Sequence, residues 1–155
     1  MKTFKQLLNE LFQQHYPYKK TVELGDSNHP HIHEYEFETH NKSKYKINID
    51  HTIYGKNNHH AEVHFSHVNE DGHEQQHITN NKKDESHKVF GTVHHIVKNH
   101  IKSYPEVSNI KFSSHNKEPS RTKLYRTISN KLSHSHEETH GSNYTQFKIN
   151  TKNLK

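Results

Sequence analysis

The chain has 155 residues, of which 20 are histidine, and its 22 Lys and Arg exceed its 17 Asp and Glu to give a formal charge of +5. Leu, Ile, Val and Phe together number 31, or 20% of the chain, which is close to the limit below which a chain fails to bury a core. The length favours one domain, and no apolar stretch approaches the roughly 18 residues of a membrane span. Cysteine is absent, which excludes disulfides, thiolate metal sites and cysteine nucleophiles.

The first 16 residues have the spacing of an amphipathic helix. Thr3 is a suitable N-cap, and Pro17 ends the helix. Apolar side chains recur three and four residues apart, which places them on one stripe. This N-terminal stripe consists of Phe4, Leu7, Leu8, Leu11 and Phe12. We expect the remaining residues, 17–155, to form a single α+β domain.

From residue 18 to about residue 79 the apolar residues alternate with polar ones. The alternation runs through Val22 and Leu24, then His33, Tyr35 and Phe37, then Tyr45, Ile47 and Ile49, then Ala61, Val63, Phe65 and His67, with a weaker run over 73–79. Gly, Asn, Asp and Ser separate these runs. The pattern predicts an antiparallel meander of four or five strands with one face in water.

The second half alternates between helical and strand-like spacing. In order, we expect a helix with apolar positions from 89 to 101, a strand over 107–112, a helix over 119–132, a polar loop over 133–143 and a strand over 147–149. Ser86 is a candidate cap for the first of these helices. The whole chain therefore reads as an α+β fold in the order helix, meander, helix, strand, helix, strand.

Histidine is spread along the whole chain and forms no compact metal motif such as HExxH. His31 and His33, or His60 and His64, could each offer two ligands from one strand face. We nevertheless expect most histidines at solvent-exposed polar positions, with weak, nonspecific binding of nickel or zinc, no specific metal site and no cofactor.

Other chemistries have little support in the sequence. No GxSxG nucleophile motif is present. The lysines are scattered, and Arg121 and Arg126 are the only arginines, so no basic track with stacking aromatic residues indicates nucleic-acid binding. We expect neither a nucleic-acid partner nor a small-molecule substrate.

Three segments resemble a family of small proteins of large tailed bacteriophages. They are residues 89–93 (VFGTV), 110–114 (IKFSS) and 119–126 (PSRTKLYR), and the family shares the pattern VFATV…FSA…SRxKLYxRL. The most distinctive part is the run from Ser120 to Tyr125. The resemblance covers most of the chain, because the family also has an N-terminal meander.

The order of elements in the second half also resembles the GNAT acyltransferase fold. In that fold a tyrosine of an LYxxxG motif acts as a general acid, and Tyr125 matches it. GNAT enzymes hold the acyl-CoA pyrophosphate on a (Q/R)xxGx(G/A) turn at a helix N-terminus. Residues 84–91 of this chain have one glycine and two acids instead, and the acids would repel the cofactor.

The N-terminus resembles the short segments that direct internal head proteins of large tailed phages into the assembling capsid. In that group a maturation protease cuts after Leu-x-Glu, which Leu8-Asn9-Glu10 matches. This resemblance implies a virion location and possible processing at Glu10.

We therefore expect a noncatalytic virion or virion-associated protein of a tailed phage, located in the particle or in the cytoplasm of the infected host cell. Its partners would be other phage virion proteins, contacted through the N-terminal stripe and through Arg121 and Arg126. One alternative is a GNAT-like acyltransferase, active or degenerate, with Tyr125 as general acid. A further alternative is a metal-binding or metal-buffering protein.

Overall fold

The structure, a computed structural model, describes residues 1–25, 31–75 and 83–155. Its elements in chain order are α1 (Phe4–Gln13), β1 (Tyr18–Leu24), β2 (Ile32–Glu38), β3 (Lys44–Ile53), β4 (His59–Val68), β5 (Glu74–Gln75), α2 (Lys83–Ser103), β6 (Asn109–His115), α3 (Pro119–Leu132), β7 (Glu137–His140), β8 (Tyr144–Asn150) and a short 3-10 helix (Thr151–Asn153). The chain is thus an α+β protein, as the sequence predicts.

The strands form one mixed sheet in the order β1-β2-β3-β4-β6-β8-β7, with β5 paired to β4. Strands β1 to β4 pair antiparallel, as expected for a meander. Strand β6 pairs with β4 in parallel, because the connection between them crosses over through α2 and returns in the same direction. In this strand order β1 lies at one edge of the sheet, and the meander of β1 to β4 occupies one half of it.

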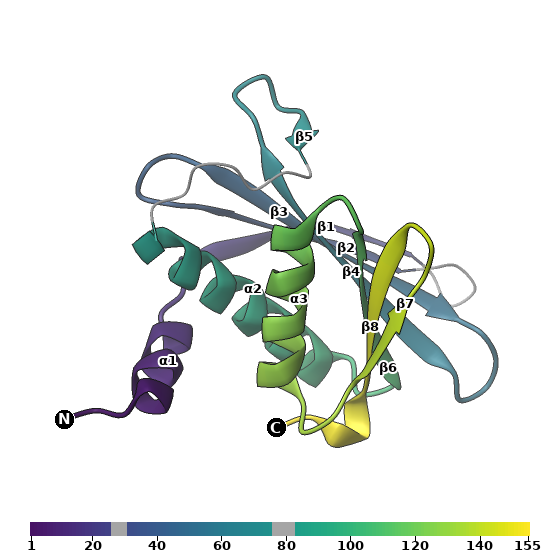
Figure 1. The fold of residues 1–155 in the computed structure, drawn as a ribbon. Coiled ribbons are helices and arrows are strands. Elements are labelled where there is room, and N and C mark those ends of the chain that lie inside the picture. The colour runs from purple at the N-terminus through teal and green to yellow at the C-terminus, as the bar shows by residue number, and fades with distance from the viewer. Residues whose placement is uncertain (26–30, 76–82) are drawn as a thin grey trace.

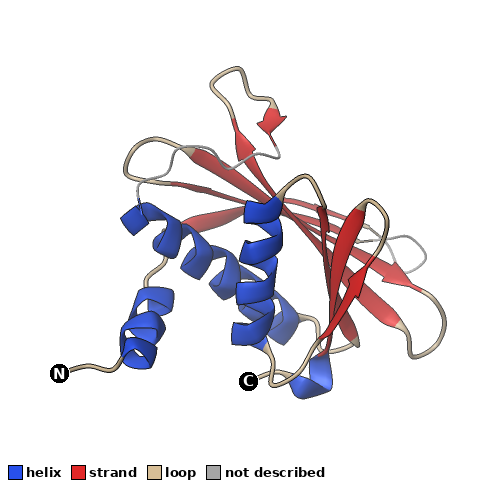
Figure 2. Cartoon of the chain, viewed as in Figure 1, coloured by secondary structure: helices blue, strands red, loops and turns tan. Residues whose placement is uncertain are grey.

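Both long helices, α2 and α3, lie on the same side of the sheet (Figures 1 and 2). We call this side the helix face and the other the open face. Strand β3 shows why the sheet is two-sided: Tyr45, Ile47 and Ile49 are buried, whereas Lys46 and Asn48 between them are only partly buried. Alternation along a strand sends successive side chains to opposite faces, so the apolar set meets the helices.

The core fills the space between the helix face and the two helices. Its fully buried members include Val63 of β4, Ile96 of α2, Ile110 of β6, Ile128 of α3 and Phe147 of β8. The few apolar residues of the chain are thus concentrated on the faces where sheet and helices meet, which explains how a chain with so little hydrophobic content forms a core.

Two boundaries differ from the expectation. Residues 137–140, expected within a polar loop, form β7, which pairs antiparallel with β8. This polar edge strand is supported by charge: Glu137 lies opposite Lys148, and Glu138 forms an ion pair with Arg126 of α3.

The other difference concerns the start of α2. Ser86, expected as the cap of this helix, lies inside it, because the helix already begins at Lys83. Strand β5 contains two residues, and residues 76–79 of the run expected over 73–79 lie outside the described residues. Within the described part of the chain, no helix has the length and apolar character needed to cross a bilayer.

The division between core and surface predicts unequal costs for one substitution made at two isoleucines. Ile110 is fully buried in β6, whereas Ile53 at the end of β3 is 51% exposed. Ile110→Ala should lower the free energy of unfolding by about 2–5 kcal/mol, because it removes buried methylene groups and leaves a cavity. Ile53→Ala should change it by less than about 0.5 kcal/mol. Urea denaturation of both variants tests this, and equal costs would contradict the described packing.

Candidate metal centre

Three buried histidines converge between the sheet and α2. His33 comes from β2, His51 from β3 and His100 from α2, and one ring nitrogen of each lies within 4.8 Å of those of the other two. Their exposed fractions are 1%, 0% and 2%. We call these three residues the histidine trio.

The strand register explains how the two sheet members meet. His33 lies opposite Ile49 in the β2–β3 ladder, so His51, two residues further along β3, is its diagonal neighbour on the helix face. The rings of His33 and His51 are 4.7 Å apart. Helix α2 covers this face and brings His100 within 4.7 Å of the His33 ring and 4.9 Å of the His51 ring.

A chain of hydrogen bonds runs through two members of the trio. The Nε2 atoms of His51 and His100 are 2.6 Å apart. The outer nitrogen of His100, Nδ1, lies 2.7 Å from the Tyr35 hydroxyl, and Nδ1 of His51 lies 3.1 Å from Nε2 of His59. A neutral imidazole has one donor and one acceptor, so the chain Tyr35–His100–His51–His59 is satisfied when every ring is neutral.

His33 is bonded differently. Its Nε2 is buried and has no hydrogen-bond partner, an uncommon state for a buried polar atom. Its Nδ1 faces outward, 3.5 Å from the Tyr104 hydroxyl and 3.8 Å from a carboxylate oxygen of Glu23. Tyr104 in turn donates a hydrogen bond of 2.8 Å to Glu23.

Burial keeps the trio uncharged. It is the main cause that lowers the pKa of His33 to about 4 and that of His51 to about 3, and the Lys20 ammonium contributes in the same direction. Burial likewise lowers the pKa of His100 and raises that of Tyr35 to about 12. Each of these groups is therefore neutral at physiological pH.

The arrangement allows three lone pairs to point at one place. When His100 Nδ1–H donates to Tyr35 and His51 Nδ1–H donates to His59, both of their Nε2 atoms become acceptors facing each other. Two facing lone pairs repel each other unless a proton or a metal ion lies between them. A ring nitrogen of His33 lies within 4.8 Å of a ring nitrogen of each of the other two histidines, and the buried Nε2 of His33 has no hydrogen-bond partner. Partners on the outer nitrogens, which fix the tautomer and the ring orientation, are typical of metal-binding histidines.

The sequence offers two histidine pairs as metal ligands, and the structure places these two pairs on opposite faces of the sheet. His33 belongs to the trio, and the half-buried His31 lies nearby, with its ring 6.2 Å from that of His33. His60 and His64 are on the open face, because they lie opposite Thr52 and Asn48 of β3. The two pairs therefore cannot converge on one ion.

The two histidines of the second pair have different surroundings. His60 is buried next to Asn58 and Asn109. His64 is exposed and lies 3.9 Å from carboxylate oxygens of Asp50 and Glu62. Neither joins the trio.

The expectation that histidine occupies exposed positions fails at five places. The buried histidines of the described chain are His33, His51, His59, His60 and His100. Sequence reasoning did not propose His51 or His100 as ligands, although a signal was present. His51 continues the alternation of the buried residues of β3, and His100 continues the apolar spacing of α2. A histidine that stands at a core position of such a pattern is buried, so its ring nitrogens need hydrogen-bond or metal partners inside the protein.

The residues expected to contact partners lie elsewhere. Of the N-terminal stripe, Phe4 and Leu7 are 77% and 47% exposed, and the side chains of Leu8, Leu11 and Phe12 lie outside the described residues.

The two arginines are held by intradomain carboxylates. Arg126 donates to Glu138 from Nε at 3.1 Å and also from a terminal nitrogen. Arg121 is buried, 4.0 Å from Glu118.

Tyr125, the proposed general acid, is 1% exposed and packs against Phe112. Its hydroxyl accepts a hydrogen bond of 3.3 Å from the backbone N–H of Phe65. Burial raises its pKa, so the hydroxyl stays protonated.

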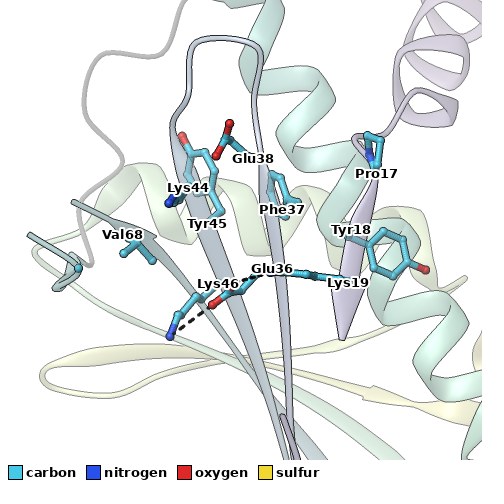
Figure 3. A pocket seen from close by; sticks show the side chains of 11 residues that line it. Pro17, Tyr18, Lys19, Glu36, Phe37, Glu38, Lys44, Tyr45, Lys46 and Val68 are labelled. Carbon is cyan, nitrogen blue, oxygen red and sulfur yellow. Dashed lines mark ion pairs between the residues drawn. The ribbon is translucent and has the colours of Figure 1, made fainter. Parts of the chain in front are cut away.

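A hollow of about 620 Å³ lies at the other end of β1, β2 and β3 (Figure 3). Its charged residues neutralise one another: Glu36 lies 3.7 Å from Lys46 and 3.8 Å from Lys19. No member of the histidine trio lines it, so the hollow is separate from the candidate centre.

Comparison with known proteins gives a family and one distant structural likeness. No curated protein matches the chain at a significant level. A solved structure described as a phosphinothricin N-acetyltransferase is similar over 77% of this chain and 71% of that protein's chain, with 14% sequence identity and a TM-score of 0.43. So low a similarity supports no statement about activity. A family model described as a family of unknown function (DUF6934) matches residues 13–152, which include the whole histidine trio. The chain belongs to this family, DUF6934.

Proposed function

We propose that the protein binds one transition-metal ion through Nε2 of His33, His51 and His100. The observation that carries the proposal is the convergence of three buried imidazoles with an unpartnered His33 Nε2 among them. Ligand nitrogens of a tetrahedral zinc ion lie roughly 3.3 Å apart, given bonds of about 2.0–2.1 Å. The Nε2 atoms of His51 and His100 are 2.6 Å apart, and ring nitrogens of all three histidines lie within 4.8 Å of one another, so ring movements of an ångström or two, roughly, would reach the tetrahedral spacing.

The chemistry of the donors limits the kind of ion. Imidazole nitrogen suits zinc, copper, nickel and iron, whereas magnesium and calcium prefer oxygen ligands. The nearby carboxylate of Glu23 approaches His33 from its outer nitrogen, so it supports the ligand instead of replacing it. We therefore propose a borderline transition metal such as zinc, held by three protein ligands with a fourth position for another donor.

Two other functions stay predictions. The exposure of Phe4 and Leu7 is compatible with a virion protein that binds its partner through α1. For a GNAT-like acyltransferase, a substrate would have to reach the buried Tyr125 hydroxyl in place of the Phe65 N–H. Binding of acetyl-CoA at micromolar concentration would favour this alternative over the metal proposal.

Titration with cobalt(II) tests the proposal, because a tetrahedral nitrogen site gives a visible absorption band that weak surface binding does not. We expect one ion per chain, displaced by zinc. His100→Ala should weaken binding by more than the roughly 10- to 100-fold that is typical for loss of an outer partner, because it removes a ligand.

His95→Ala is the matched control for this titration. His95 is half-buried on the same helix, and its ring stacks on His15 at 3.9 Å, away from the trio. This variant should bind cobalt like the wild type. Graded, weak uptake by the wild type, or equal affinity in the His100→Ala variant, would contradict the proposal.

A second substitution separates ligation from core packing. His33→Leu removes a buried nitrogen that has no partner, so it should leave the free energy of unfolding of the metal-free protein unchanged or increased. The same variant should lose the cobalt band. If His33 only packs in the core, His33→Leu should leave cobalt binding intact.

The lowered pKa values predict the pH dependence of the metal-free protein. Above pH 6.5 the trio is neutral in both folded and unfolded chains, so its contribution to stability is complete. As pH falls from 6.5 towards 4, the unfolded chain takes up protons that His33 and His51 refuse in the folded state. Each histidine then lowers the free energy of unfolding by up to about 1.4 kcal/mol per pH unit.

Urea denaturation of wild type and His51→Leu between pH 7.5 and pH 4 measures this effect. The variant should lose stability less steeply as pH falls, since it lacks one of these groups. Parallel curves for the two proteins would show that His51 is protonated alike in the folded and unfolded chains.

A further inference from the structure

The histidine trio is closed off from solvent, and one side chain covers all of it. Tyr104 follows directly after α2, and its half-buried ring lies 4.6 Å from the ring of His100, 4.7 Å from that of His33 and 5.1 Å from that of His51. Because the three histidines are almost completely buried, an ion entering from the side of Tyr104 must displace this ring.

Two residues of β1 hold Tyr104 in place. Its hydroxyl donates to Glu23 at 2.8 Å and accepts from the Lys20 ammonium at 3.1 Å. Lys20 and Glu23 also form an ion pair of 3.0 Å, in which the Glu23 side chain is 58% exposed. The hydroxyl is thus tied to charged groups at the surface, while the ring lies over the histidines.

The backbone of Tyr104 is anchored at the end of α2, and its partly buried ring packs at the edge of the core. Its N–H bonds to the carbonyl oxygens of His100 and Ile101 in the last turn of α2, and its own carbonyl accepts from Val107. The residue therefore stands at the end of the helix, in a turn. Its two hydroxyl partners lie on β1, which pairs with one neighbour only, β2, among the described strands.

We propose that Tyr104 is the movable cover of the histidine trio, and that Lys20 and Glu23 latch it and so set the rate at which a metal ion enters and leaves. This inference rests on the proposed metal-binding function. The hydroxyl bonds break when the ring swings away, so the latch contributes to the barrier for uptake and for release alike. Equilibrium affinity depends on the ligands and is affected less.

Stopped-flow mixing with cobalt(II), followed through the absorption band of the bound ion, separates the two claims. The final amplitude reports the site, and the time course reports the cover. Tyr104→Phe keeps the ring and removes the hydroxyl, with its hydrogen bonds to Glu23 and Lys20 and its 3.5 Å contact with His33 Nδ1. Uptake and release should both become at least about tenfold faster, because two hydrogen bonds to charged groups are lost.

A second variant and a matched control keep the test independent of folding defects. Glu23→Gln removes the ion pair with Lys20, so uptake should accelerate severalfold. Because salt screens exposed ion pairs, we expect added salt to accelerate uptake by the wild type and to have a smaller effect on this variant. Tyr18→Phe removes a hydroxyl on the same strand that accepts from Asn99 at 3.1 Å. It should leave the rate unchanged.

The outcomes distinguish the latch from the metal site. Normal amplitude with wild-type rates in Tyr104→Phe would overturn the cover and leave the metal centre standing. Acceleration by Tyr18→Phe as large as that by Tyr104→Phe would also overturn it, because the effect would then not be specific to the latch. Absence of the cobalt band in the wild type would overturn the metal centre and the cover together.

Discussion

The hydrogen bond between the Nε2 atoms of His51 and His100, 2.6 Å long, joins the sheet to α2 at a place where an ordinary small domain would use apolar side chains. Burial of these imidazoles costs free energy unless their nitrogens are bonded. Three hydrogen bonds offset that cost: the bond between His51 and His100, the bond of His100 to Tyr35 and the bond of His51 to His59. One end of the interface between sheet and helix is therefore polar and directional, and the position of α2 over β2 and β3 depends on it.

The remainder of the core is built in the usual way. Around Val63, Ile110 and Phe147 the helix face is apolar and fully buried, and non-directional burial stabilises it. The chain thus divides its inner layer into an apolar part and an imidazole part. The apolar part accounts for folding. The imidazole part contains the buried His33 Nε2, which has no hydrogen-bond partner. Apolar side chains could take the place of these imidazoles if stability were the only requirement. That contrast is the physical reason for treating the trio as a functional site.

The sequence predicted the class of fold and most of its elements, because periodicity depends on neighbours along the chain. The alternation through Tyr45, Ile47 and Ile49 indicated the buried side of β3, and it also placed His51 on that side. It could not show that His51 meets His33, since this depends on the β2–β3 register. Nor could it show that His100 arrives from α2, more than 45 residues away, because the crossing of helix and sheet is set by the packing of the whole core.

The same limit applies to the second histidine pair, which lies away from the trio. His60 and His64 have the same spacing as residues on one strand face, and that local reading was correct. The face was the open one, which the described helices do not cover (Figure 2). In a chain with 20 histidines, many pairs have the spacing of two metal ligands. The three histidines of the trio share a further property, because they stand at positions where the sequence pattern places buried core residues.

The most direct measurement of the central claim is anomalous diffraction at the zinc edge from crystals grown with one equivalent of zinc. The account predicts a single strong peak bonded to Nε2 of His33, His51 and His100 at about 2.0–2.1 Å, with Tyr35 and His59 still on the outer nitrogens. Zinc peaks confined to exposed histidines, with the 2.6 Å contact between His51 and His100 unchanged, would contradict it.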